Sequence, residues 1–239
     1  MRKNEKWIKL SAVVLCESFT VFTIIRLLKG GEPDRLALAF GTILLVLLPV
    51  VLEKYFRCRI SLPVYMFALA YAIGPMLGHC WKLYYTVPVW DKLLHISGGV
   101  MFAILGAYFF DLLTKAKALP TARVIFALCF SMAIAVLWEF CEFGADIFLG
   151  MDMQDDTVVH GLTSYLLGES LGVTGRISNI ESVAVNGTLL PVDGYIDVGL
   201  IDTMLDMLLE TLGAIVTCLA LWLDKGKHSW IQKSCEKNV

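Results

Sequence analysis

The chain of 239 residues is 57% hydrophobic and 18% charged, whereas soluble domains contain roughly 45–50% apolar and about 25% charged residues. Its net charge of −2 and pI near 6.1 provide no basic surface of the kind that binds nucleic acid, so a nucleic-acid partner is excluded. The cysteines number seven and show no CxxC spacing, which argues against a disulfide framework or structural zinc. We therefore expect an integral membrane protein whose excess apolar residues face lipid.

The mean hydropathy of +0.70 arises from repeated apolar segments. A helix needs about 20 mostly apolar residues to cross a bilayer. The sequence thus predicts an all-α integral membrane protein with about six transmembrane helices, forming a single membrane domain over residues 1–239. The expected spans are 7–28, 36–52, 62–78, 90–113, 123–149 and 198–223.

Basic residues predict the orientation of these spans. They gather at the N-terminus, after the second and fourth spans, and in the C-terminal tail, for example at Lys6, Lys54, Lys115 and Lys233. Cytoplasmic loops carry such an excess of Lys and Arg. We expect both termini in the cytoplasm.

The acidic segment 150–197 is then predicted to lie outside, as a small extracytoplasmic cap. Asn186-Gly187 stands between β-prone flanks, a pattern typical of a tight hairpin. The segment Val158–Leu171 is apolar enough to lie on the membrane or to re-enter it. A loop of this length is usually functional or disordered.

Ionisable residues occur inside the last three expected spans. Asp91 and His95 are four residues apart at the start of the fourth. Spacings of three and four place further acids on one face of each later helix, namely Glu139, Glu142 and Asp146 in the fifth span and Asp202, Asp206 and Glu210 in the sixth. The predicted topology brings all three groups to a similar depth in the outer half of the membrane, which indicates one shared site.

Seven carboxylates in one site must be neutralised, because each acid at a helix centre costs roughly 2.5–3.5 kcal/mol on insertion scales. Shared protons are one solution, and a divalent cation is the other. Magnesium, manganese, calcium, zinc and iron all suit several carboxylates with one imidazole. The predicted metal ligands are Asp91, His95, Glu139, Glu142, Asp202 and Asp206, and the predicted rim or surrounding residues are Asp146, Glu210, His160 and Lys92.

Three blocks of sequence carry a family resemblance. They are Asp91-Lys-Leu-Leu-His95, Trp138-Glu139-Phe-Cys-Glu142, and Asp202-Thr-Met-Leu-Asp206-Met207 followed by Gly213-Ala214. Their order and spacing resemble the YjdF-type predicted membrane proteins and, more distantly, the VanZ-like family. The resemblance covers about residues 91–214. It implies a multi-pass protein of a bacterial cytoplasmic membrane and a role in the cell envelope.

Three functions fit these expectations. The first is a metal-dependent hydrolase or transferase that acts on a lipid-linked or envelope substrate, with one carboxylate as general base. The second is a cation or proton transporter, in which Glu17 of the first span continues the path inward. The third is a non-enzymatic envelope scaffold with a structural metal. Membrane lipid is an expected partner in each case.

Overall fold

A computed structural model describes residues 3–32, 35–114, 119–224 and 235–237. Six of its helices are long and apolar enough to cross a membrane, as predicted, and most of them extend slightly beyond the expected bounds. These six are α1 (Lys3–Gly30), α2 (Leu36–Tyr55), α3 (Leu62–Cys80), α5 (Trp90–Thr114), α6 (Pro120–Leu149) and α7 (Leu200–Asp224). A short helix, α4 (Leu83–Thr86), precedes α5. Lys115 and Lys233, on which part of the predicted orientation rests, lie outside the described residues.

The chain forms two compact units. The first consists of residues 1–135 and 209–239, and the second consists of residues 136–208. Both α6 and α7 pass from one unit to the other.

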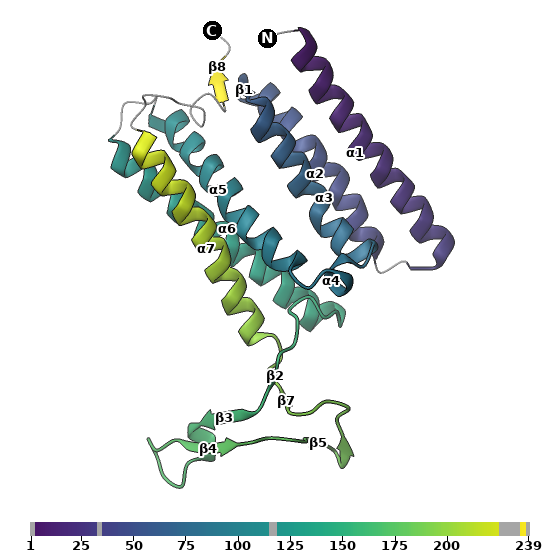
Figure 1. The fold of residues 1–239 in the computed structure, drawn as a ribbon, viewed down its shortest axis with the longest axis vertical. Helices are drawn as coiled ribbons and strands as arrows, with labels where there is room; N and C mark the ends of the chain where they lie inside the picture. The colour runs from purple at the N-terminus through teal and green to yellow at the C-terminus, as the bar shows by residue number, and fades with distance from the viewer. Residues whose placement is uncertain (1–2, 33–34, 115–118, 225–234, 238–239) are drawn as a thin grey trace. The chain divides into compact units, whose positions relative to one another are not determined.

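In the first unit, α1, α2 and α3 pack against one another, and α3 also contacts α4 and α5 (Figure 1). Buried side chains such as Val46 and Leu69 form the core among the first three helices. A second core joins α5 to the parts of α6 and α7 in this unit, through Ala103, Ala127 and Cys218. Small residues dominate this second core, so these helices approach one another closely.

The outer faces of these helices carry large apolar side chains. Leu15 on α1 and Leu44 on α2 are 70% and 72% exposed, respectively. Such apolar surfaces are unfavourable in water, but they are compatible with lipid tails, which are as apolar as leucine. The exposed leucines therefore mark the parts of α1 and α2 that face the bilayer.

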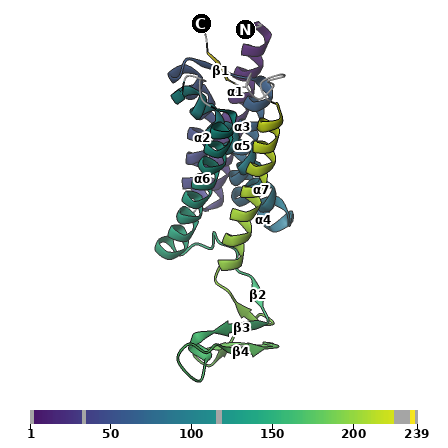
Figure 2. The ribbon, with the colours of Figure 1, turned by 90° about the vertical axis from the view of Figure 1, so that its left-hand side faces the viewer.

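Partly buried ion pairs lie at the end of the first unit where α1 begins. Lys9 donates to Glu53 at 2.6 Å and also to the main-chain oxygen of Ile60, and Arg59 pairs with Glu5. Strand β1 (Cys58–Ile60) pairs there with β8 (Cys235–Lys237). Figures 1 and 2 show both strands beside the start of α1. The two ends of the described chain thus lie at the same end of the helices, as six crossings require.

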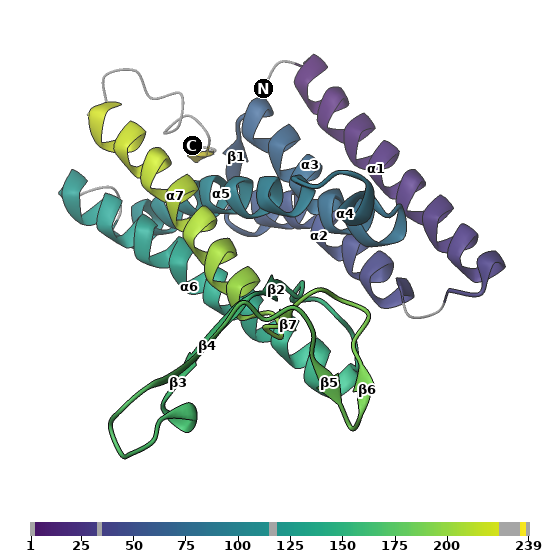
Figure 3. The same cartoon turned by 60° about the horizontal axis from the view of Figure 1, so that its bottom comes forward.

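The second unit contains short antiparallel strands between α6 and α7. Strand β2 (Val158–Val159) pairs with β7 (Tyr195–Ile196), and β3 (Gly161–Ser164) pairs with β4 (Gly175–Ser178). A 3-10 turn follows β3 at Tyr165–Leu167. Figure 3 shows that β3 and β4 form one arm and that β5 and β6 form another. The segment Val158–Leu171 therefore consists of short strands up to Ser164 followed by turns, and its association with lipid stays a prediction.

The hairpin predicted at Asn186-Gly187 is confirmed. Strands β5 (Ala184–Val185) and β6 (Thr188–Leu189) pair in register, with Val185 opposite Thr188. Asn186 and Gly187 have φ angles of 52° and 82°. Two consecutive positive φ angles define the tight turn that asparagine followed by glycine adopts most readily.

Candidate functional site

His95 is the centre of a polar group in the first unit. Its side chain is only 7% exposed, and its Nε2 atom lies 3.4 Å from Asp91 Oδ1, one helical turn earlier on α5. The other carboxylate oxygen of Asp91 accepts a hydrogen bond from Lys92 Nζ at 3.0 Å. The start of α5 therefore presents an imidazole beside an acid whose charge is partly balanced.

Glu210 on α7 approaches the opposite side of the same ring. Its Oε2 atom lies 4.0 Å from His95 Nδ1, and its side chain is 5% exposed. Residues 95 and 210 are far apart in sequence, so tertiary packing decides this contact. The imidazole of His95 lies between two acids, with one nitrogen toward each.

Glycines allow α5 and α7 to come this close. A Cβ atom on Gly99 would overlap the main-chain oxygen of Glu210, and one on Gly213 would overlap the main-chain oxygen of Ile96. On the other side of α5, Ser131 of α6 donates to the oxygen of Gly99 at 3.3 Å. The glycines thus determine how near the carboxylate of Glu210 can reach.

This geometry suits a metal ligand with an orienting partner. Two ligands about 2.1 Å from an ion in tetrahedral geometry lie about 3.4 Å apart, which is the separation of His95 Nε2 and Asp91 Oδ1. A histidine that binds a metal usually directs its other nitrogen to a carboxylate, which fixes its tautomer. Glu210 is placed for that second role, although 4.0 Å is longer than a hydrogen bond.

The second unit holds a pair of glutamates on α6. Glu139 and Glu142 are both buried, and carboxylate oxygens of the two lie within 4.8 Å of each other. Trp138 Nε1 donates to Glu142 Oε1 at 2.8 Å. The spacing of three residues places both acids on one helix face, as predicted.

Two further acids of this unit bind the chain that follows α6. Asp146 accepts hydrogen bonds from the main-chain nitrogens of Met153 and Gln154, at 2.6 and 3.0 Å. Asp202, in the first turn of α7, accepts one from the nitrogen of Asp155 at 3.1 Å. Asp206, one turn later, is 1% exposed. Asp146 and Asp202 therefore fix the segment that joins the end of α6 to the start of α7.

Sequence reasoning missed the role of Asp197. Its two carboxylate oxygens accept from the main-chain nitrogens of Thr157 and Ile201, each at 2.8 Å. Partial burial favours the neutral acid, but hydrogen bonds from the backbone outweigh that effect and lower the pKa of Asp197. An aspartate just before an apolar helix is the signal that could have revealed this cap.

The remaining predicted residue, His160, serves the strand region. Its ring is exposed, and its Nδ1 atom lies 3.0 Å from the main-chain oxygen of Ile180. In the same unit, burial and the charges of Asp152, Asp197 and Asp146 raise the pKa of Asp156. The prediction that acids of all three helices share one site involves residues of both compact units, and it stays a prediction.

Six apolar helices that carry a buried histidine and several buried acids define a polytopic helical membrane protein. The chain belongs to the family described as predicted membrane protein (DUF2238), whose model matches residues 11–226. Comparison with curated proteins and with solved structures found no match. The family match supports a membrane protein of unknown function and does not extend to the YjdF-type or VanZ-like families.

Proposed function

We propose that the protein binds a divalent metal ion at His95 and uses it to hydrolyse a lipid-linked or envelope substrate, or to transfer a group from one. The observation that carries this proposal is the placement of the His95 ring, with Asp91 at 3.4 Å and Glu210 at 4.0 Å. Asp91 and His95 supply ligands of the types that divalent metals accept. A metal so held acidifies a bound water or polarises an ester or phosphoryl oxygen.

The residues around the proposed ion have distinct roles. Lys92 balances part of the charge of Asp91, and the negative charge of Glu210 on the Nδ1 side of the ring favours a proton on Nδ1, which would leave Nε2 free to bind. The sequence predicts that Glu139, Glu142, Asp202 and Asp206 belong to the same site. A carboxylate not engaged as a ligand would accept the proton of the attacking water.

We place this chemistry in a bacterial cytoplasmic membrane, with both termini in the cytoplasm and the site in the outer half. The distribution of Lys and Arg supports the orientation. The resemblance to YjdF-type and VanZ-like proteins supports a substrate of the cell envelope.

Metal analysis of detergent-purified protein tests the proposal. We expect a bound divalent metal by mass spectrometry, and we expect His95→Ala to lose it. His79→Ala is the matched control, because His79 lies in another membrane helix and its ring contacts Tyr84. An unchanged metal content in His95→Ala would refute the proposal, whichever metal is present.

One observation favours cation or proton transport as a second candidate. Glu17 lies in the middle of α1, and its buried Oε1 atom has no hydrogen-bond partner among the residues that the structure describes. Flux measurements in proteoliposomes distinguish the two functions. Uptake that requires both Glu17 and His95 would favour transport over hydrolysis. A scaffold with a structural metal would instead lose thermal stability on chelation and show neither turnover nor flux.

A further inference from the structure

A second feature of the first unit is an apolar cavity between α2, α3 and α5. Its volume is about 120 Å³, and apart from Met101 its lining side chains are aliphatic or aromatic. The lining residues of α5 begin at Met101, beyond the turns that carry Asp91 and His95. The cavity is therefore separate from the candidate metal site.

The cavity opens sideways toward the bilayer. Leu45 and Leu48 of α2 line it and are also 44% and 42% exposed. Both lie in a span of high hydropathy, where exposed side chains meet lipid. Pro49, in the same wall, lacks the N–H that would bond the oxygen of Leu45, so α2 is less regular at this point. A lipid chain in the bilayer can therefore enter without crossing water.

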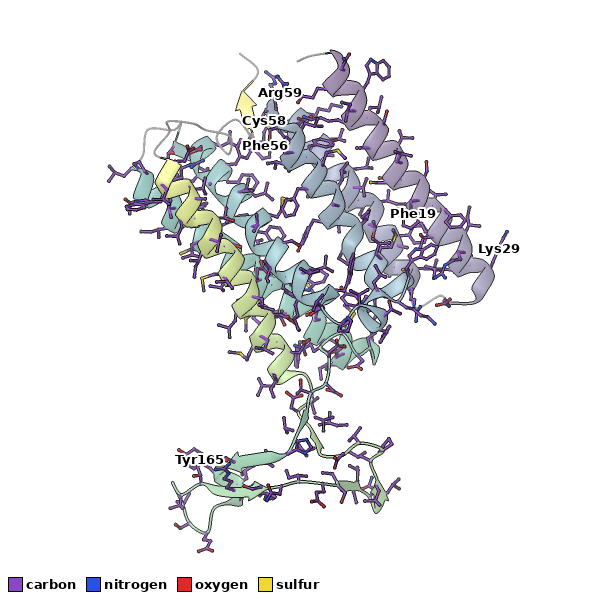
Figure 4. The ribbon with its side chains drawn as sticks, viewed as in Figure 1. Phe19, Lys29, Phe56, Cys58, Arg59 and Tyr165 are labelled. Atoms are coloured by element: carbon purple, nitrogen blue, oxygen red, sulfur yellow. The ribbon has the colours of Figure 1, made fainter. Side chains whose placement is uncertain are left out.

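One end of the cavity reaches the turn between α2 and α3. Leu52 and Ile60 line this end, and Phe56 between them stacks edge-on with Tyr108, which also lines the cavity. Figure 4 shows Phe56, Cys58 and Arg59 together at this end of the first unit. The turn between these two lining residues carries Lys54 and Arg57.

Two cations at this turn are available to a ligand. Lys54 and Arg57 are exposed, and neither forms an ion pair with a described residue. Of the acids at this end, Glu53 pairs with Lys9 and Glu5 pairs with Arg59, while Glu236 of β8 stands opposite Arg59 in the strand register. Arg57 has a positive φ of 48° in the turn. Two exposed cations thus lie in the turn that joins Leu52 to Ile60 at one end of the cavity.

We infer that this cavity binds an anionic phospholipid, with an acyl chain between α2, α3 and α5 and the phosphate at Lys54 and Arg57. Two features match the two parts of such a lipid: the apolar walls of the cavity match the acyl chain, and the exposed cations of the neighbouring turn match the headgroup. Basic residues at the membrane boundary attract anionic headgroups in this way. A zwitterionic lipid would gain the apolar contacts but less of the electrostatic attraction.

Photocrosslinking in nanodiscs tests the inference. Phosphatidylglycerol and phosphatidylcholine, each with a photoreactive acyl chain, are compared at equal concentration in otherwise identical bilayers. We expect crosslinks to map to the cavity walls on α2, α3 and α5, with phosphatidylglycerol labelled at least threefold more. Equal labelling by the two lipids, or crosslinks confined to the outer faces of α1 and α6, would overturn the inference.

Variants separate the chain site from the headgroup site. Ala68→Trp fills the cavity and should reduce labelling by both lipids at least fivefold, whereas Ala70→Trp on the exposed face of α3 should not. Lys54→Gln with Arg57→Gln should abolish the preference for phosphatidylglycerol, whereas Lys29→Gln with Lys82→Gln should keep it.

Gel filtration and thermal unfolding show whether Ala68→Trp is folded, and Ala68→Leu replaces it if it is not. Labelling that is equal in Ala68→Trp and Ala70→Trp would refute the chain site. Metal content is measured on the same samples. Loss of lipid labelling with unchanged metal keeps this inference independent of the proposed function.

Discussion

Nδ1 of His95 lies 4.0 Å from a carboxylate oxygen of Glu210, across the close contact of α5 with α7. The first prediction follows from this relationship. Glu210→Gln removes the charge that favours a proton on Nδ1, so His95 is less well oriented. We expect the affinity for a divalent metal to fall about 10–100-fold without being lost. Competition with a chelating dye measures the metal affinity.

The control is Glu32→Gln, because Glu32 pairs with Arg35 and not with an imidazole. An affinity equal to wild type in Glu210→Gln would exclude the orienting role.

The second prediction concerns the acids that the sequence assigns to the same site. Glu139→Ala with Asp206→Ala removes two buried carboxylates, one on α6 and one on α7. If both belong to the metal site, the purified double variant should contain no bound metal. Its content is compared with that of Asp152→Ala with Asp193→Ala, which removes two exposed acids of the loop. Full metal content in the buried pair variant would show that Glu139 and Asp206 are not needed to bind the metal.

The third prediction tests the glycine contact. A methyl group on Gly99 would meet the main-chain oxygen of Glu210, so Gly99→Ala must push α7 away from α5. Overpacking of this kind costs about 1–3 kcal/mol. Thermal unfolding in detergent should show a lower midpoint, and metal affinity should fall with it.

Gly41→Ala is the matched control for Gly99→Ala. Gly41 also lies inside a membrane helix, but a methyl group there meets no atom within 4 Å. Alanine is preferred to glycine within a helix by roughly 0.5–1 kcal/mol. The Gly41 variant should therefore be as stable as wild type or more stable. If Gly99→Ala were as stable as Gly41→Ala, the close contact of α5 with α7 would not be required.

The fourth prediction concerns the cap of α7. Asp197→Ala removes the acceptor of two main-chain N–H groups and should cost about 0.5–2 kcal/mol of stability. Because the pKa of Asp197 is lowered on folding, its stabilisation is complete above the unfolded pKa of about 4. It is lost as pH falls through the lower pKa of the folded state. Unfolding midpoints at pH 6 and pH 3 should thus differ less in Asp197→Ala than in wild type.

Asp193→Ala is the control for Asp197→Ala, because Asp193 is an exposed acid in the same loop. It should leave both the midpoint and its pH dependence unchanged. Equal pH dependence in wild type and Asp197→Ala would show that protonation of Asp197 does not contribute to the pH dependence of stability.

Much of the fold could be predicted because its signals are local. A helix in lipid must satisfy its own backbone, so each apolar segment of sufficient length specifies one span. The turn at Asn186-Gly187 could be predicted equally well, because Asn and Gly adopt positive φ angles at little energetic cost. The strands β2 and β7 were not foreseen, since Val158 and Ile196 pair across nearly forty residues with no local signal.

Of the candidate site, too, only the part that depends on local spacing could be predicted. Periodicity placed Asp91 beside His95 and Glu139 beside Glu142, because residues three or four apart share a helix face. Periodicity could not show that Asp146 and Asp202 accept hydrogen bonds from the chain after α6. It also gave Glu210 no definite partner.

The sequence by itself therefore determined the six spans, the hairpin and the helix face on which each acid lies, because all of these depend on neighbours within a turn. Only the tertiary structure decided that His95 meets Glu210, since that contact requires Gly99 and Gly213 to bring two backbones together. The same holds for Lys9 and Glu53, whose pairing depends on how α1 packs against α2. A charge that is buried without a partner destabilises the fold, so His95 and Lys9 each need an acid beside them. The packing of the helices determines which acid that is.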